Sequence, residues 1–239
     1  MRHGIIARIE QDRFIPSLQT GNIHFSTNYD YQKFESNFND HAIGAEEGIV
    51  HERINPQNIR LWNSQGKLLP KPDKVTRTYI AQNKCWISSW MYLSVDSWTH
   101  FPRKDEKEEI ALKPEIIKDL KRLEKEKINF EKKQNNPDCK CSLIMMDWNT
   151  FINGIIKNDI YACFIKYRRE IDPIKLEFNN ELELFGYKPW SYAYQREIRL
   201  VLPDKFNTHH NANIFIPQFK DKVTSGFKIN ELNNTHFLF

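Results

Sequence analysis

A core strand begins within Tyr194-Gln195-Arg196-Glu197-Ile198-Arg199-Leu200-Val201-Leu202, where a polar loop runs into apolar sequence. Polar and apolar residues alternate after the loop, as they do in a core strand. Side chains of an extended backbone point alternately to its two sides, so Gln195 and Glu197 would face one side while Arg196 faces the other. The sequence therefore predicts an amide and a carboxylate that share one cleft. The alternative is a Glu and an Arg that flank a strand and pair with surface charges.

The rest of the chain predicts further short strands around this one. Runs rich in apolar, β-branched and aromatic residues favour strands at 4–9, 22–26, 75–92 (as paired strands), 141–146, 160–167, 213–216 and 227–229. Helices are expected at 11–19, ended by Gly21, and after Asp147, a residue type that caps helices. The strands follow one another too closely for regular βαβ alternation. This spacing favours an α+β fold of mostly antiparallel strands in one domain, 1–239.

One segment departs from the composition of the rest. From 103 to 138 the chain is dense in Lys and Glu, with Pro114 suited to start a helix. A narrow apolar stripe follows Pro114, made of Ile116, Ile117, Leu120 and Leu123. The segment predicts an exposed, charged, amphipathic helical insertion. Its charged side is expected to be a solvated face, with a docking surface for a partner as the alternative.

Composition excludes several common classes of enzyme. The chain has 239 residues, 40% of them hydrophobic, and this is enough for a core. Its eight glycines are placed so that neither GxGxxG nor GxxxxGK[ST] occurs, and HExxH and GxSxG are also absent. A Rossmann dinucleotide fold, a P-loop NTPase, and the common zinc proteases and serine hydrolases are therefore not expected. The net charge of +4 permits a polyanionic partner without requiring one.

The spacing of the cysteines and the lengths of the apolar runs indicate whether to expect a metal cofactor and where in the cell the protein acts. The four cysteines, at 85, 139, 141 and 163, form no CxxC, so no metal cofactor is expected. The first residues reach polar sequence after three apolar ones, which is too short for a signal-peptide core, and no window approaches 18 apolar residues. We expect a soluble protein of the reducing cytoplasm that does not bind membranes.

The Gln195-x-Glu197 segment resembles the catalytic loop of the ADP-ribosyltransferases. Sites of that family combine an Arg or His on the first strand, a Ser-rich middle strand, and a Glu in an [E/Q]-x-E segment. Here Arg8 lies on the first predicted strand, and Cys85-Trp86-Ile87-Ser88-Ser89-Trp90 is similar to the Ser-rich strand. The chain also resembles an uncharacterised bacterial family through the segments 18–26, 46–48 and 190–199. The resemblance covers most of the chain outside the charged insertion, and it implies split, mostly antiparallel sheets flanked by helices.

The resemblance also implies a role for each matching residue, with NAD as co-substrate. Glu197 would stabilise the oxocarbenium-like ribose that forms as nicotinamide leaves, because a carboxylate there favours the transition state over the ground state. Gln195 would orient the nucleophile, Arg8 would hold the pyrophosphate, and Ser88 or Ser89 would support Glu197 or the ribose.

The residue that serves as the Arg or His of the first strand has a second candidate. His24, with Ser26 beside it, could take the place of Arg8 in a His-Tyr-Glu variant of the site. Tyr29 or Tyr31 would then stack on nicotinamide; Tyr31 is a candidate for this contact in either variant.

The resemblance further implies a biological setting. ADP-ribosyltransferases of this type occur as toxins in bacterial toxin–antitoxin and phage-defence modules, including one that modifies messenger RNA beside an antitoxin and a chaperone. Gln195 replaces the first Glu of arginine-modifying members, which is similar to transferases that act on side-chain amides or nucleobases. The expected activity is ADP-ribose transfer to a nucleic acid, RNA before DNA, in growth control or phage defence. The expected protein partner is a neutralising antitoxin.

Two other functions compete with this expectation. A metal-dependent nuclease could use the carboxylates of Glu181 and Glu183, or Glu124 and Glu126 with Lys127. A non-enzymatic module could bind nucleic acid through basic and aromatic side chains, which occur throughout a chain that is 13% aromatic.

Overall fold

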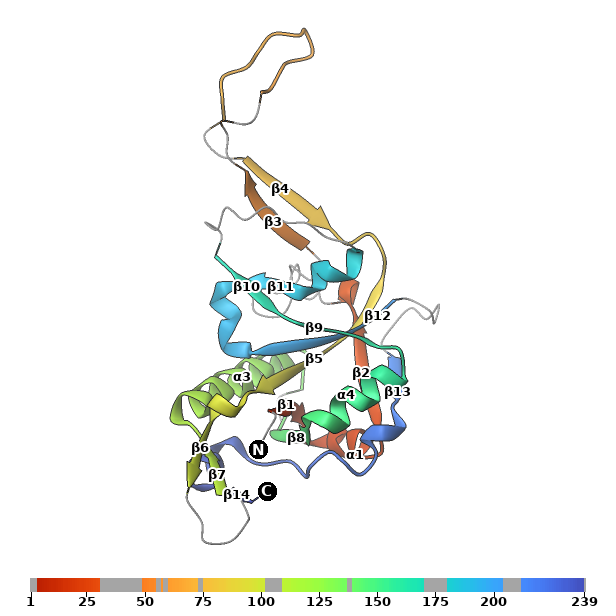
Figure 1. Ribbon diagram of the computed structural model, residues 1–239, viewed down its shortest axis with the longest axis vertical. Coiled ribbons are helices and arrows are strands. Elements are labelled where there is room, and N and C mark those ends of the chain that lie inside the picture. The colour runs from red at the N-terminus through yellow and green to blue at the C-terminus, as the bar shows by residue number, and fades with distance from the viewer. Residues whose placement is uncertain are drawn as a thin grey trace.

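The computed structural model describes residues 4–30, 49–54, 57, 60–72, 75–101, 109–136, 139–169, 180–203 and 212–238. Its largest unit is a seven-stranded sheet built on β5 (Cys85–Leu93) (Figure 1). One edge of β5 pairs with β12 (Glu197–Pro203), which pairs in turn with β9 (Tyr161–Phe164). Every pairing in this sheet is antiparallel. The expected class, mixed α+β with mostly antiparallel strands, is confirmed.

The other edge of β5 is shared by two strands, and the sheet forks there. β1 (Ile5–Gln11) pairs with the end of β5, up to Ala7 opposite Met91. β2 (Asn22–Thr27) pairs with the beginning of β5, where Ser26 lies opposite Ile87. Beyond β1 lies β8 (Cys141–Asp147), and beyond β2 lies β13 (Ala212–Phe215). Because β1 and β2 diverge, the middle of β5 lies beside the opening between them.

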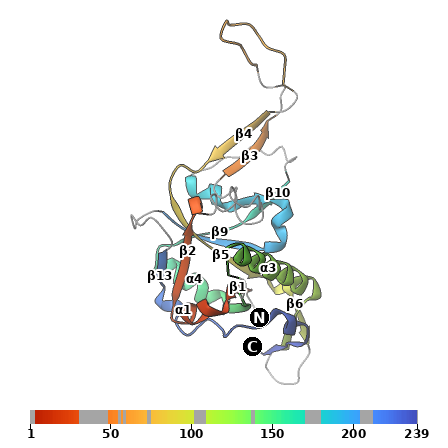
Figure 2. The same ribbon diagram turned by 180° about the vertical axis from the view of Figure 1, so that it is seen from behind.

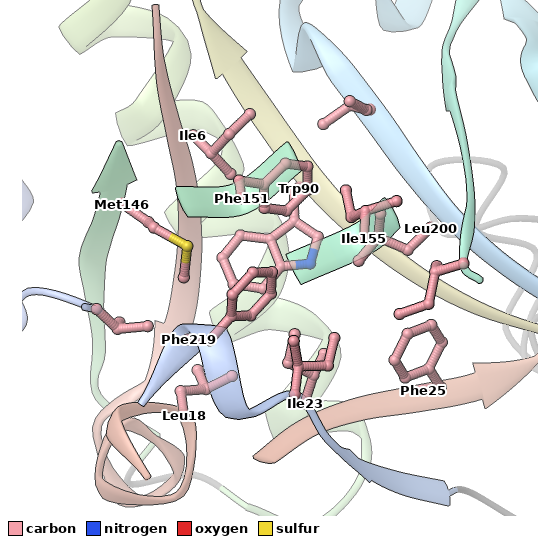
Figure 3. Packing of buried hydrophobic residues seen from close by; sticks show 14 of the residues in the cluster. Ile6, Leu18, Ile23, Phe25, Trp90, Met146, Phe151, Ile155, Leu200 and Phe219 are labelled. Carbon is pink, nitrogen blue, oxygen red and sulfur yellow. The ribbon is translucent and has the colours of Figure 1, made fainter. Parts of the chain in front are cut away.

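Alternation along the central strands produces a core on each face of the sheet. On one face, Trp90 of β5 contacts two rings, Phe151 and Phe219, at centroid distances of 5.6 and 6.4 Å (Figure 3). This face is covered by α1 (Ile15–Gln19), α4 (Trp148–Lys157) and the 3-10 turn η6 (Pro217–Phe219). Figures 1 and 2 place the third helix, α3 (Pro114–Lys133), on the opposite face.

Local sequence explains how α4 and α1 begin and end. The Asp147 side chain accepts a hydrogen bond from the Thr150 backbone N–H at 2.9 Å and so caps α4, as expected. Gly154 lets α4 approach η6, because a Cβ there would meet the Phe219 ring at 2.3 Å. Gly21 follows α1 with φ of +90°, a conformation that favours glycine.

The charged segment is part of the core, which corrects the expectation of an exposed insertion. The helix at Pro114 and its apolar stripe are present as predicted, but Ile116, Ile117 and Leu120 are buried against the sheet. They cover the face of β1, β5 and β8 that would otherwise expose apolar side chains, while charged residues such as Lys118 and Lys125 remain exposed. Composition indicated the solvated face correctly, but it did not indicate how much of the core the stripe would supply.

Three smaller sheets complete the described structure. They are formed by β3 (Ile49–Ile54) with β4 (Val75–Ile80), β6 (Trp98–Phe101) with β7 (Glu109–Leu112) and β14 (Phe237–Leu238), and β10 (Lys166–Arg168) with β11 (Tyr187–Pro189). The remaining 3-10 turns are η1 (Asp12–Phe14), η3 (Val95–Ser97), η4 (Glu181–Gly186), η5 (Trp190–Gln195) and η7 (Ile229–Asn234). No helix in the described ranges is long and apolar enough to cross a membrane.

Three predicted strands differ from the structure. The run 75–92 contains β4 and most of β5, which lie in separate sheets and do not pair with each other. The run 160–167 is broken at Ile165, whose backbone N–H donates to the Glu197 carbonyl, so that β9 and β10 belong to different sheets. At 227–229, Phe227 forms a bridge with Leu143 and Ile229 already begins η7. Apolar composition does not show where a strand changes partner.

Candidate functional site

A pocket of about 300 Å³ lies at the fork of the main sheet. β1, β5, α3, β11, η5 and β12 all contribute to its lining. The chain segments that form it are far apart in sequence and meet where β1 turns away from β5. The lining residues are Arg8, Ile9, Ser89, Trp90, Met91, Leu123, Glu126, Lys127, Phe130, Glu131, Lys188, Gln195 and Glu197.

Glu197, the first residue of β12, places a buried carboxylate in this pocket. One carboxylate oxygen accepts hydrogen bonds from the Ser89 hydroxyl at 2.6 Å and from Arg199 Nε at 2.7 Å. The other oxygen accepts from Lys188 Nζ at 2.6 Å. Ser89 and Glu197 meet because they lie on the same side of adjacent strands, β5 and β12.

Two cations keep this carboxylate ionised. Burial by itself raises the pKa of Glu197, but Arg199 and Lys188 outweigh that effect and lower the pKa to about 2. Arg199 is fully buried and also donates from Nη1 to the Phe185 carbonyl at 2.7 Å. A buried charge is tolerated when it is paired and hydrogen-bonded, as both conditions are here. The pocket therefore holds a fixed anion at neutral pH.

Gln195 lines the same pocket as Glu197, although the backbone between them is not extended. Gln195 ends η5, and Arg196 adopts a left-handed conformation with φ of +46° and ψ of +41°. The Lys188 ammonium joins the two side chains, at 2.9 Å from Gln195 Oε1 and 2.6 Å from Glu197 Oε2. A left-handed non-glycine residue is a strained position of the kind found at functional sites.

Arg8 enters the pocket from β1 and lies 5.4 Å from the centroid of the Trp90 ring. Its Nη1 donates to the Ser88 hydroxyl at 2.8 Å, and its Nε lies 2.8 Å from Glu10 Oε2. Ser88 and Ser89 therefore have different partners, since they point to opposite sides of β5. Ser89 is the one that contacts Glu197 and lines the pocket, while Ser88 is buried behind Arg8.

A second buried ion pair connects α3 to β1 beside the pocket. Lys127 Nζ lies 2.6 Å from Glu10 Oε1 and donates to the Ile9 carbonyl at 2.8 Å. Burial raises the pKa of Glu10, but Lys127 and Arg8 overcome this and lower it to about 2. The carboxylate of Glu10 thereby holds Arg8 and Lys127, two of the pocket's cations, in place.

The part of α3 that lines the pocket also contacts η5. The Tyr194 hydroxyl donates to the Glu126 carboxylate, at 2.8 and 2.7 Å from its two oxygens. Arg122 pairs with Glu126 at 3.0 Å and lies over the Tyr194 ring at 3.6 Å. These contacts hold the residue that precedes Gln195 against the helix.

His24, Ser26 and Tyr29, which belong to the alternative assignment, lie outside the pocket lining. His24 on β2 contacts Asn213 Oδ1 through Nδ1 at 3.2 Å, and its Nε2 lies 3.5 Å from the Ser26 hydroxyl. Tyr29 is exposed and donates its hydroxyl proton to the Gln82 carbonyl at 3.0 Å. Tyr31 lies outside the described residues. Of the two assignments, Arg8 is the one that lines the same pocket as Glu197.

Sequence reasoning missed several residues that complete the pocket. Arg199 could have been found, because it follows Glu197 by two positions and so shares its side of the strand. Lys188 and Tyr167 gave no such signal; Tyr167 accepts the backbone N–H of Glu197 at 2.8 Å from the separate strand β10. Phe130 lines the pocket from the segment that was expected to be solvated.

The carboxylates considered for a nuclease are dispersed. Glu181 accepts the backbone N–H groups of Gln82 and Asn83, and so serves as a cap for the turn before β5. Glu126 belongs to the pocket wall, where it holds Tyr194. Within the part of the chain that the structure describes, no three His, Cys, Asp or Glu side chains gather as they would to hold a metal ion.

Comparison with known proteins adds no further assignment. The chain matches no model of a known protein family, no curated protein and no solved structure.

Proposed function

We propose that the chain is an NAD-dependent ADP-ribosyltransferase that modifies nucleic acid, RNA before DNA. In this reaction the bond between ribose C1′ and the nicotinamide nitrogen breaks, and its electron pair neutralises the pyridinium ring as nicotinamide leaves. The acceptor then bonds to C1′ and loses a proton. The ribose carbon is most electron-poor between these events, so an adjacent fixed anion accelerates the reaction.

The observation that carries this proposal is the buried, ionised carboxylate of Glu197 in a pocket shared with Gln195, Ser89 and Arg8. Because the carboxylate is already desolvated and oriented, it needs no reorganisation when positive charge develops nearby. An anion in this position is what the proposed reaction requires. Its separation from bulk water also increases the effect of its charge.

The other lining residues suit the parts of NAD. Arg8 and Lys127 are cations that could pair with the pyrophosphate, and Phe130 presents an aromatic ring for a planar base. A volume of about 300 Å³ is at the lower end for small-molecule pockets, which suits the nicotinamide and its ribose more than the whole dinucleotide. In the proposed complex, the adenosine half extends out of the pocket.

Lys188 must change partner in this proposal. Its ammonium group lies between Gln195 and Glu197, where it neutralises the carboxylate and occupies one of its oxygens. The phosphates of NAD offer this ammonium an alternative anion. A shift of Lys188 toward them would leave Glu197 Oε2 to accept a ribose hydroxyl.

Gln195 contributes to the acceptor side of the proposed reaction. An uncharged amide donates and accepts at once, which suits an exocyclic base amine as nucleophile. By resemblance, the biological role is that of a toxin in bacterial growth control or phage defence, held inactive by an antitoxin protein.

The test is incubation of the purified protein with NAD labelled in its adenylate part and with separate pools of RNA, DNA and protein. We expect label to enter the RNA pool and NAD to raise the melting temperature. Label confined to the DNA or protein pool would overturn RNA as the acceptor. No labelling in any pool, together with no shift by NAD, would overturn the transferase itself.

Matched variants show whether the pair of Glu197 and Lys188 is needed for transfer. The double variant Glu197→Gln/Lys188→Gln removes one negative and one positive charge, so the net charge of the cluster with Arg199 is unchanged. The control Glu115→Gln/Lys118→Gln makes the same exchange at exposed positions of α3. We expect the first variant to lose at least a hundredfold in labelling, a typical effect of removing an electrostatic catalyst, and the control to keep it. Equal labelling by the two would contradict the role of Glu197.

A further inference from the structure

The two strands that bring Lys188 to the pocket also present side chains on their outer side. β10 and β11 form a parallel ladder in which Tyr167 lies opposite Lys188, and both of these contact Glu197. Their neighbours in the ladder therefore point the other way. In Figure 1, β10 and β11 lie beside each other, and η5 leads from them to the start of β12.

The neighbouring positions of the two strands, and the residues that follow them, combine cations with aromatic rings. Lys166 Nζ and Arg168 Cζ lie 5.4 and 6.0 Å from the centroid of the Tyr187 ring. Arg169 Cζ lies 5.2 Å from the centroid of Trp190, which is 53% exposed. Tyr187 also packs against the core beside Phe185. We refer to Lys166, Arg169, Trp190 and Tyr192, which are exposed or half-buried, as the aromatic-cationic face.

The face continues to the pocket. Tyr192, two residues after Trp190, has the Lys188 ammonium 5.9 Å from its ring centroid. Lys188 in turn donates to Gln195, which the proposed function assigns to the acceptor. A linear polymer bound along the face would therefore extend to Gln195, where transfer is proposed to occur.

Composition selects the kind of partner. Of the four residues of the face, two are cations and two are aromatic, and none is acidic or aliphatic. Alternating cations and rings suit single-stranded nucleic acid, whose phosphates pair with the cations while its bases stack on the rings. A membrane-inserting or protein-docking surface would bury aliphatic side chains as well.

We propose that the aromatic-cationic face binds single-stranded RNA and leads it to Gln195, an inference that rests on the proposed transferase function for its purpose. Duplex RNA fits poorly, because its bases are stacked on one another and unavailable to Trp190 and Tyr192. Binding at the face does not require NAD, and its measurement is therefore separate from that of transfer.

The test measures the anisotropy of a labelled single-stranded RNA of about ten nucleotides, within the range of site sizes for such surfaces. We expect Trp190→Ala to weaken binding about tenfold, the effect of losing one stacked base. Arg169→Gln should reduce the dependence of log affinity on log salt by about one phosphate contact. Trp190 and Arg169 are exposed, and an unchanged melting temperature verifies that each variant is folded.

The matched control is Trp62→Ala in the loop between β3 and β4. Trp62 is 58% exposed, and Arg60 and Lys67 in the same loop are exposed cations, so this loop is the competing site for RNA. We expect the control to bind RNA as the parent does. Loss of binding in Trp62→Ala with none in Trp190→Ala would overturn the proposal, as would equal affinity for duplex and single-stranded RNA.

The outcome also separates this inference from the proposed function. RNA binding that depends on Trp190, in a protein whose melting temperature NAD does not change, would support the face and count against the transferase. A shift by NAD that persists in Trp190→Ala, with RNA binding unaffected by that substitution, would overturn the face and leave the transferase standing.

Discussion

At the scale of single residues, Glu197 both supplies the proposed catalytic charge and balances two buried cations. Its carboxylate is shared by Arg199 and Lys188 on different oxygens. When a buried charge is removed, the opposite charges that paired with it remain unpaired in the protein interior, which solvates them poorly. Loss of activity in a single Glu197 variant would therefore be accompanied by a loss of stability.

The stability of Glu197 variants tests this directly. We expect Glu197→Gln to lose about 3 kcal/mol of unfolding free energy, because Arg199 and Lys188 then lack a counter-charge. The double variant Glu197→Gln/Lys188→Gln should lose less, since one of those cations is also removed. Urea unfolding of the parent and both variants gives the values. A double variant less stable than the single one would contradict this charge balance.

For Gln195 and Glu197, the sequence predicted which way the side chains point but not the backbone conformation between them. Alternation along an extended chain predicted that Gln195 and Glu197 share a cleft, and both line the pocket. The chain reaches that result through a 3-10 turn and a left-handed Arg196 instead. Nothing in a Gln-Arg-Glu sequence indicates that Arg196 will have a positive φ, since the residue lies where η5 contacts α3, which is distant in the sequence.

At the scale of elements, α3 forms part of both the core and the pocket. Its first half buries an apolar stripe against β1, β5 and β8, and its second half forms a wall of the pocket. Sequence predicted the helix, its start and its stripe, because these depend on local periodicity. The partners of the stripe depend on the fork in the sheet, which no local pattern describes.

A pair of substitutions distinguishes a core helix from an appended one. We expect Leu120→Ala, at a fully buried position, to cost about 2 to 5 kcal/mol of unfolding free energy through the cavity it leaves. Lys125→Ala, at an exposed position of the same helix, should change stability by less than about 0.5 kcal/mol. Chemical denaturation measures both. If Leu120→Ala were as stable as Lys125→Ala, the helix would not be part of the cooperative core.

At the scale of the whole molecule, two buried carboxylates connect stability to pH. Glu10 holds α3 to β1 through Lys127, and Glu197 holds β12 to β11 through Lys188. The pKa of each is lowered from 4.5 to about 2. A carboxylate whose pKa is lower in the folded state binds protons more readily in the unfolded state, so acid favours unfolding.

We therefore expect the contribution of these two carboxylates to the unfolding free energy to be constant above about pH 5 and to fall as the pH decreases from about 5 toward 2. Each carboxylate contributes a loss of roughly 3 kcal/mol over that window. Urea unfolding at a series of pH values measures the change. The Glu197→Gln/Lys188→Gln variant should lose less on acidification than the parent does. A parent with equal stability at pH 6 and pH 3 would contradict the lowered pKa values.

The sequence by itself determined the class of fold and most of its elements, because strand alternation, helix periodicity, the Asp147 cap and the Gly21 turn act over a few residues. It also made candidates of Gln195 and Glu197 and, by resemblance, of Arg8 or His24 and of Ser88 or Ser89. From this set, Arg8, Ser89, Gln195 and Glu197 are the four that line the pocket. Only the tertiary structure decided that these four surround one pocket, that Ser89 and not Ser88 meets Glu197, and that Lys188, Arg199 and α3 complete the site. The residues that line the pocket lie up to 189 positions apart in the sequence, from Arg8 to Glu197. Their contacts depend on how β1 and β2 diverge from β5, which is a property of long-range pairing that no local segment contains.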